Sequence, residues 1–150
     1  MSTSRKDDPY LGFRFQVEVD SLRVAGFSEV SGLEIEMEPE EYREGGVNSY
    51  THKLPTHFDH PNVLLERGIT DYQGLWLWIQ DVRDGNVTRK NVTVILYDSA
   101  GEESWGWECR EAYPVRWAGP ELRADQGNVA IETLELAHKG VSRMEGLPSR

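Results

Sequence analysis

The sequence predicts a mainly β fold, a barrel or sandwich with one flanking α-helix. Short runs of alternating apolar and polar residues recur along most of the chain, which is typical of half-buried strands. Only the run at 72–82 has the three-and-four spacing of a helix. The 150 residues, 38% of them hydrophobic, are enough for one core, so we expect a single domain over 1–150 with flexible ends at about 1–8 and 142–150.

The N-terminal third is predicted to form a β-meander. Phe13–Val19 alternates apolar with polar residues, and Asp20 and Ser21 before Leu22 are typical of a hairpin corner. A second alternating strand places Leu33, Ile35 and Met37 on one face, which we expect to be buried in the core. Its other face, expected to meet water or a partner, carries Glu34, Glu36 and Glu38.

The segment Glu40–Leu54 follows this strand and combines charge, aromatic residues and the Gly45–Gly46 pair. An ordinary domain would have a short turn here, so we interpret the segment as a contact with other copies of the chain. The next segment, Pro55–Pro61, is predicted to be a loop. It contributes histidines whose spacing does not force them to converge with His52, so we expect no metal site.

Asn62–Arg67 is predicted to be a strand, and Thr70–Gln73 has the pattern of a capping box at the start of a helix. Asp84–Asn86 would end that helix. The apolar stripe predicted to face the sheet consists of Tyr72, Leu75, Trp76, Ile79 and Val82. Leu77 and Trp78 lie off this stripe, which indicates either a partner surface or a wide apolar face.

The clearest hairpin follows, with strands at Val92–Tyr97 and Trp105–Cys109 and a turn at Asp98–Gly101. Cys109, the single cysteine, is expected to be a buried structural thiol. A last strand is predicted from Val129 to about His138. Its apolar parity changes between Ile131 and Leu134, which favours a bulge.

The charge of −10 comes from 26 acidic and 16 basic residues, without a basic cluster, which argues against sequence-specific nucleic-acid binding. An acidic solubilising surface and a salt-loving source both fit this charge. No apolar stretch has the length of a secretory signal or of a membrane span. We therefore expect assembly in the cytoplasm and no membrane contact in the resting state.

Catalytic machinery is not predicted. Ser99, His138 and Asp98 supply the residue types of a catalytic triad, but no nucleophile elbow accompanies them, so we do not expect a triad. Gly45–Gly46 lacks the lysine and helix of a phosphate loop, so we expect no cofactor. These patterns alone indicate a soluble β-rich domain that assembles.

Six ordered blocks between Asp8 and Val141 resemble the tail tube family of contractile phage tails and phage-tail-like extracellular injection systems. The most specific are the segments EYREGG, LERGIT and IETLELAH; the six blocks are DPYLGFRFQVEV, GFSEVSGLEIEMEPEEYREGG, HKLP, LERGITDYQGLWLWIQDV, RKNVTVILYDSAGEE and VAIETLELAHKG. The resemblance implies a tail-tube-like fold whose copies form sixfold rings that stack into a hollow tube. It also implies a sheath, baseplate or tube-initiator and tube-terminator proteins as partners, with cargo or a tape measure in the lumen.

Within this resemblance, the subunit-interface candidates are Glu34, Glu36, Glu38, Tyr42, Arg43, Glu44, Gly45, Gly46 and Arg67. The glutamates would face either the lumen or a neighbouring subunit. In the second case they would need arginine partners such as Arg43 or Arg67, because an unpaired buried charge is costly. Alternatives within the same machine are a tube-initiator or tube-terminator ring, or a more remote type VI secretion tube. A carbohydrate-binding β-sandwich or a small hydrolase is the alternative from another class.

Overall fold

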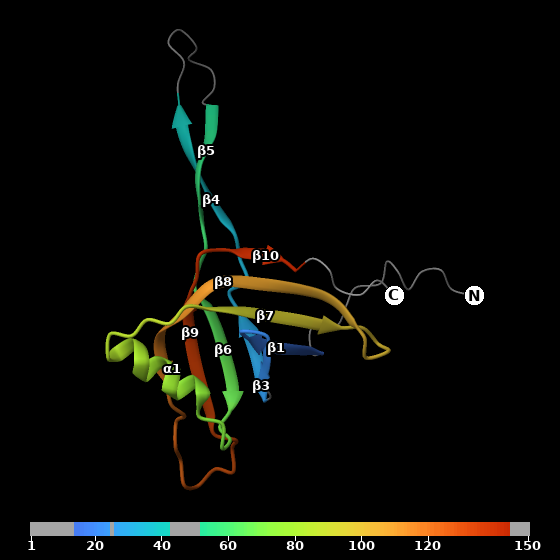
Figure 1. Ribbon diagram of the computed structural model, residues 1–150, viewed down its shortest axis with the longest axis vertical. Coiled ribbons are helices and arrows are strands. Elements are labelled where there is room, and N and C mark those ends of the chain that lie inside the picture. The colour runs from blue at the N-terminus through green and yellow to red at the C-terminus, as the bar shows by residue number, and fades with distance from the viewer. Residues whose placement is uncertain (1–13, 25, 43–51, 145–150) are drawn as a thin grey trace, which may run out of the picture.

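The computed structural model describes residues 14–24, 26–42 and 52–144, including the backbone but not the side chains of 40–42 and 52–57. One α-helix and ten β-strands make up this part of the chain (Figure 1). The mainly β prediction with one helix is confirmed. No helix among the described residues has the length and apolarity needed to cross a membrane.

The first hairpin matches its prediction. Strand β1 (Phe15–Val19) pairs antiparallel with β2 (Leu22–Val24), and both corner residues, Asp20 and Ser21, have positive φ angles of 50° and 66°. A two-residue corner of this kind matches the right-handed twist of the strands. The Asp20 carboxylate also accepts a hydrogen bond from the Asn91 amide at 3.0 Å, which ties the corner to β7 (Lys90–Tyr97).

The meander prediction is wrong. The main sheet has the order β2-β1-β7-β8-β9-β6-β3, with β10 added beside β8. Strand β3 (Phe27–Ser31) pairs with β6 (Val63–Gly68) instead of β2. Alternation indicates that a segment is a strand but not which strand it pairs with. Gly26 and Gly32, with positive φ angles of 88° and 90°, change the direction of the chain on either side of β3.

Strand β8 (Glu103–Ala118) is long enough to serve both halves of the sheet. Its first half pairs with β7 (Lys90–Tyr97) and with β10 (Val141–Arg143), and its second half pairs with β9 (Ile131–Ala137). The predicted hairpin between β7 and β8 is confirmed. The main sheet bends around a core made of Val17, Val19, Val24, Val63, Leu65, Leu75, Trp78, Val92, Val94, Cys109, Ala112, Leu134 and Leu136.

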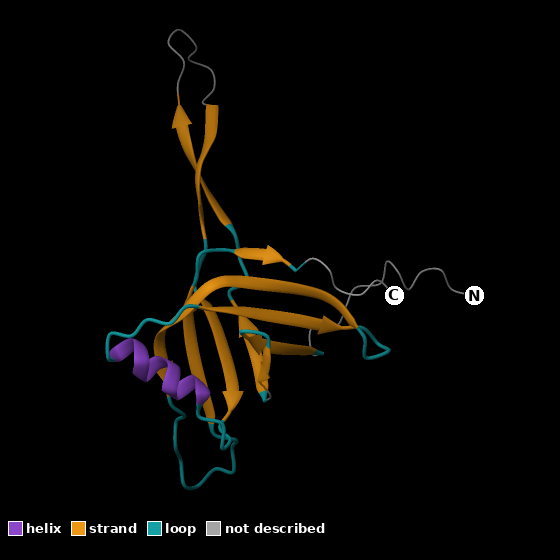
Figure 2. Cartoon of the chain, viewed as in Figure 1, coloured by secondary structure: helices purple, strands orange, loops and turns teal. Residues whose placement is uncertain are grey.

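Helix α1 (Gly74–Arg83) lies against β8 at one side of the sheet (Figure 2), and it ends as predicted, with Asp84 as the C-cap. The predicted capping box does not form. Gln73 is the N-cap and its side chain makes no capping bond, whereas Thr70 Oγ1 accepts hydrogen bonds from the Tyr72 amide and from Arg67 Nη2. The threonine is therefore used in the turn before the helix.

The buried face of α1 matches the predicted stripe only in part: Leu75 is buried as predicted, but the aromatic residues differ. Trp78 is buried and its indole N–H donates to the Thr88 carbonyl at 2.8 Å, while Tyr72 and Trp76 are exposed. Leu77 is also exposed. Spacing alone could not choose between two tryptophans that are two residues apart, and the hydrogen bond of Trp78 satisfies the polar N–H of the indole that is buried.

No bulge interrupts the pairing of β9 with β6. The change in apolar parity arises because Glu132 occupies an inward-facing position directly opposite Arg67. Both side chains are buried, Arg67 to 2% and Glu132 to 6% of full exposure. A charged pair thus replaces an apolar pair in the core.

Strands β4 (Glu36–Tyr42) and β5 (His52–Asp59) form a separate two-stranded sheet, which we call the arm. The arm projects away from the body of the subunit (Figure 1). Two predictions are corrected here: most of Pro55–Pro61 belongs to a strand and is not a loop, and Ile35 and Met37 are exposed and not in the core. Only Leu33, which precedes the arm, packs against the core.

Replacing Gly32 by alanine should lower the free energy of unfolding by more than about 1 kcal/mol. Gly32 has a positive φ of 90°, and a Cβ there would collide with the Asn62 backbone carbonyl at the base of the arm. Gly85→Ala is the matched control, because Gly85 has a φ of 92° with nothing near its missing Cβ. Urea unfolding of both variants measures the effect. An equal decrease in the free energy of unfolding in the two variants would show that the collision at Gly32 does not destabilise the fold.

Candidate functional site

The arm exposes an apolar face. Met37 lies directly opposite Phe58 across the two strands, so their side chains share one face. Met37 is 47% exposed, Phe58 is 61% exposed and the preceding Ile35 is 57% exposed. Large apolar side chains grouped on a surface are typical of a protein contact.

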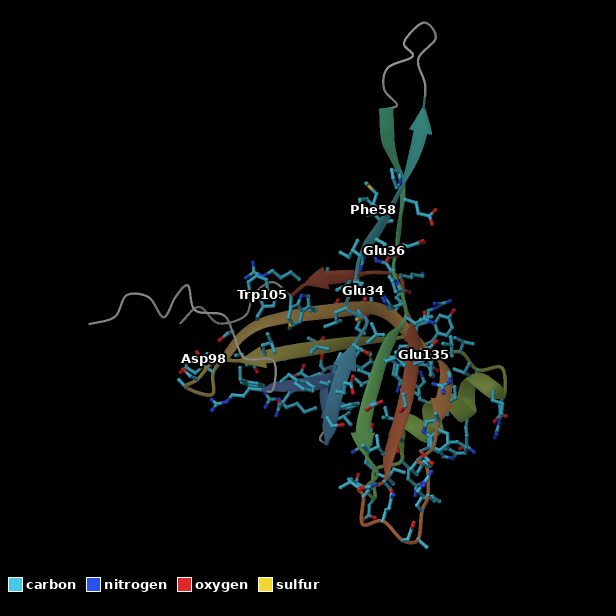
Figure 3. The ribbon with its side chains drawn as sticks, turned by 180° about the vertical axis from the view of Figure 1, so that it is seen from behind. Glu34, Glu36, Phe58, Asp98, Trp105 and Glu135 are labelled. Atoms are coloured by element: carbon cyan, nitrogen blue, oxygen red, sulfur yellow. The ribbon has the colours of Figure 1, made fainter. Side chains whose placement is uncertain are left out.

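The opposite face of the arm is acidic. Glu36 lies directly opposite Asp59, and Glu34 and Glu38 are exposed beside them. Figure 3 shows Glu34, Glu36 and Phe58 along the lower part of the arm. Like charges in directly opposed positions destabilise a strand pair, so the Glu36–Asp59 pairing does not by itself stabilise the hairpin.

An isolated two-stranded ribbon is at best marginally stable in water. The arm has strands of seven and eight residues, so it extends by about 25 Å. Its strands form no ladder with the main sheet among the described residues. Its apolar face therefore has the properties of a surface that becomes buried against another molecule.

The structure places three of the nine predicted interface residues on the arm. Glu36 and Glu38 lie on β4, and Tyr42 ends that strand with only its backbone described, whereas Glu34 precedes the strand. Arg43, Glu44, Gly45 and Gly46 lie outside the described residues, as do most of the predicted contact segment, the predicted flexible N-terminal end and residues 145–150. The first residues of the predicted flexible C-terminal end, 142–143, belong instead to β10.

Arg67 lies elsewhere, inside the subunit. Its guanidinium donates to Thr70 Oγ1 at 3.1 Å and packs over the rings of Phe27 and Tyr72, with centroid distances of 5.8 and 5.2 Å. Its buried position gives no support to a role at a subunit interface. Burial raises the pKa of the neighbouring Glu132 carboxyl, while the Arg67 charge and the Trp117 side chain oppose that rise.

The histidines at the base of the arm have structural partners. His138 donates from Nε2 to the Pro61 carbonyl at 2.9 Å and accepts the Gly140 amide at Nδ1 at 3.1 Å. The His60 ring lies 5.8 Å from that of His138. Across the described ranges, no three His, Cys, Asp or Glu side chains are grouped to hold a metal ion.

The serine, histidine and aspartate considered for catalysis do not come together. Asp98 is in the β7–β8 turn, where its carboxylate accepts the Ala100 and Glu102 amides, both at 2.9 Å. Ser99 belongs to the same turn, whereas His138 is held at the base of the arm. The Asp98 side chain organises the turn (Figure 3).

A groove between α1 and β8, which we call the α1–β8 groove, was not predicted. It has a volume of about 530 Å³, and its lining includes Trp76, Ile79, Val82, Arg83, Val115 and Trp117. Trp76 meets Trp117 edge-on, with ring centroids 4.7 Å apart. The apolar stripe of the helix was the available signal, but only folding brings β8 beside it.

Cys109 is fully buried in β8, as predicted. Burial among apolar neighbours raises the pKa of its thiol to about 11, and the nearby Glu108 charge adds to the rise. Because the thiolate is the reactive form, this cysteine is poorly suited to be a nucleophile.

Comparison with known proteins gives one family. The family model described as T4-like virus tail tube protein gp19 matches residues 11–142. No curated protein matches the sequence.

Solved structures agree with the family match. A chain of an extracellular contractile injection system, the PVC sheath-tube complex in its extended state, is 28% identical, with a TM-score of 0.86 and coverage of 96% of this chain and 98% of the other. A chain of the anti-feeding prophage baseplate, described as 6-fold symmetrised, is 29% identical, with a TM-score of 0.79 and coverage of 96% and 97%. A chain of the PVC sheath/tube terminator is 28% identical, with a TM-score of 0.83 and coverage of 91% and 97%.

Proposed function

The chain belongs to the T4-like virus tail tube protein gp19 family, and on that premise we propose that it is the inner tube subunit of a contractile tail or contractile injection system. The observation that carries this proposal is the family match over residues 11–142 together with the TM-score of 0.86 to a chain of a sheath-tube complex. The single domain of 1–150 would be the repeating unit of the tube.

Six copies would close into a ring, and rings would stack into a hollow tube. The sixfold symmetry of the related baseplate structure supports this number. In a ring of six copies, one surface of each copy meets a different surface of the next copy, which is a heterologous contact. Contacts of this kind close into rings or continue as filaments. The main sheet ends at β2 and β3, whose outer edges offer strand-to-strand contacts in the wall of a ring.

The arm supplies the proposed intersubunit surface. Its apolar face would be buried by a neighbouring copy, which would also stabilise the marginal two-stranded ribbon. The residues proposed for this contact are Glu34, Glu36, Glu38, Tyr42, Arg43, Glu44, Gly45 and Gly46.

The proposed action is mechanical. The sheath would surround the tube, the baseplate would start it, a terminator would end it, and the lumen would hold cargo or a tape measure. The tube would assemble in the cytoplasm, become part of the particle and be driven through a target envelope when the sheath contracts. We propose no catalytic step, in keeping with the structural role of the family.

A second candidate is a ring at one end of the same tube. The related baseplate and terminator chains have TM-scores of 0.79 and 0.83, close to that of the sheath-tube chain. Such a subunit would form rings that do not stack.

Electron microscopy of the purified chain at low salt and at molar salt tests both candidates. The charge of −10 on every copy opposes association, and salt screens this repulsion, so we expect more and longer tubes at molar salt. Single rings at both salt concentrations would favour the tube-end role. A chain that stays monomeric in both conditions would contradict the tube proposal.

A further inference from the structure

The α1–β8 groove is an apolar surface without a cover among the described residues. Its walls are held by regular elements, and Trp76 of α1 packs edge-on against Trp117 of β8. Val115 lies in the lining and is 45% exposed. The groove is thus formed before any partner arrives, which lowers the entropic cost of binding.

The rim of the groove is basic, although the chain as a whole is strongly acidic. Arg83 and Arg116 are part of the lining, and Arg89 packs over the ring of Tyr113, another lining residue, at 4.6 Å. Arg83 makes an exposed ion pair with Asp84 at 3.9 Å. Within the described part of the chain, Arg116 has no carboxylate at ion-pair distance. A partner that suits this groove has an apolar surface flanked by carboxylates.

The arm has this chemistry. Ile35, Met37 and Phe58 provide exposed apolar surface, and the opposite face carries the carboxylates of Glu36 and Asp59. A two-stranded ribbon is thin, so the long arginine side chains of the rim can extend past its edges to reach the carboxylates. In Figure 1 the arm points away from the side of the subunit where α1 lies, so an arm does not reach the groove of its own chain.

We propose that the arm of one copy docks in the α1–β8 groove of another copy, with its apolar face toward Trp76, Val115 and Trp117 and its carboxylates toward Arg83 and Arg116. This inference rests on the proposed function, because it requires that copies assemble. It names the receiving surface for the arm. Donor and acceptor surfaces differ, as a heterologous contact requires.

Cysteine cross-linking within assembled particles tests the contact. A double variant, Met37→Cys with Val115→Cys, would be assembled and treated with a short bismaleimide that joins nearby thiols. Both positions are exposed in the isolated subunit, and the native Cys109 is buried with a raised thiol pKa of about 11, so it should not compete. Denaturing gels should show a ladder of covalently linked subunits, because each copy carries one donor and one acceptor.

The matched control is Met37→Cys with Leu122→Cys, since Leu122 is 80% exposed in the segment between β8 and β9 and does not line the groove. The single variants Met37→Cys and Val115→Cys should give no ladder. A ladder that ends at the number of subunits in a ring would place the contact within rings, and a longer ladder would place it between rings; both support docking. Particles that form normally without a ladder, or with an equal ladder in the control, would overturn it.

A charge exchange provides a second readout. Glu36→Arg and Arg116→Glu should each lower the yield of assembled particles about tenfold or more, because each places like charges together. The double variant should restore the yield to about the wild-type level, and failure of this rescue would count against the pairing. If wild-type chains form neither tubes nor rings, the proposed function fails; if they assemble without the cross-link, only the docking inference fails.

Discussion

Replacing Arg67 by methionine is expected to lower the free energy of unfolding of the subunit by about 3–5 kcal/mol. Arg67 is 2% exposed and lies opposite Glu132, which is 6% exposed. Its removal leaves a carboxylate in the core without its neighbouring cation and also removes the hydrogen bond to Thr70. Urea unfolding at a protein concentration where the subunit is monomeric measures this loss.

The double variant Arg67→Met with Glu132→Leu separates charge from packing. Replacing two opposite buried charges together by apolar residues leaves no uncompensated charge in the core, so most of the stability should return. If the double variant is as unstable as Arg67→Met, the loss comes from the packing of Arg67 on Phe27 and Tyr72 and not from the charge left on Glu132.

The effect of Arg67→Met should also depend on pH. Because burial raises the pKa of Glu132 above its ordinary value of 4.5, the folded state holds the proton more tightly than the unfolded state. The contribution of Glu132 to stability is therefore full below about pH 4.5 and is lost as pH rises through its folded-state pKa. Without Arg67 that pKa rises further, so the difference from wild type should be smaller at low pH than at neutral pH.

Replacing both Met37 and Phe58 by aspartate is expected to abolish assembly while the subunit stays folded. Burial of a large apolar side chain contributes about 2 kcal/mol, so losing two of them should weaken each contact by about 4 kcal/mol, or roughly 1,000-fold. Both side chains are exposed in the isolated subunit, so its unfolding midpoint should change little. Sedimentation velocity and electron microscopy measure assembly.

The control for added charge is Gln126→Asp with Asn128→Asp, which adds the same two negative charges in the exposed segment between β8 and β9. This variant should assemble at molar salt, where the general repulsion is screened. Tubes formed by the Met37 and Phe58 variant at the wild-type yield would show that the apolar face of the arm lies outside the subunit contacts.

Local chemistry made some elements predictable from the sequence. The β1–β2 corner, the β7–β8 hairpin and the end of α1 depend on neighbouring residues, and all three form as predicted. The burial of Cys109 was also predictable, because it alternates with Trp105 and Trp107 on one strand. The ordered blocks that resemble tail tubes identified the family, which the family model then confirmed.

Other features depended on contacts between distant segments. The change in apolar parity at Ile131–Leu134 was interpreted as a bulge. The residues near Glu132 in the sequence do not indicate that Arg67 lies opposite it, so an inward-facing glutamate could not be predicted. Likewise, the local spacing does not show which of Trp76 and Trp78 is buried. In the structure, Trp78 is the one whose indole N–H donates to the distant Thr88 carbonyl.

The sequence alone determined that this protein is a mainly β subunit of the tail tube family, with an acidic surface and a conspicuous segment after Leu33–Glu38. Only the tertiary structure decided that the strands on both sides of this segment pair as a projecting arm, that Ile35 and Met37 are exposed, and that a groove with a basic rim lies between α1 and β8. The physical reason is that alternation sets which side chains share a face of a strand. Whether that face meets the core, solvent or another copy depends on where the rest of the chain packs.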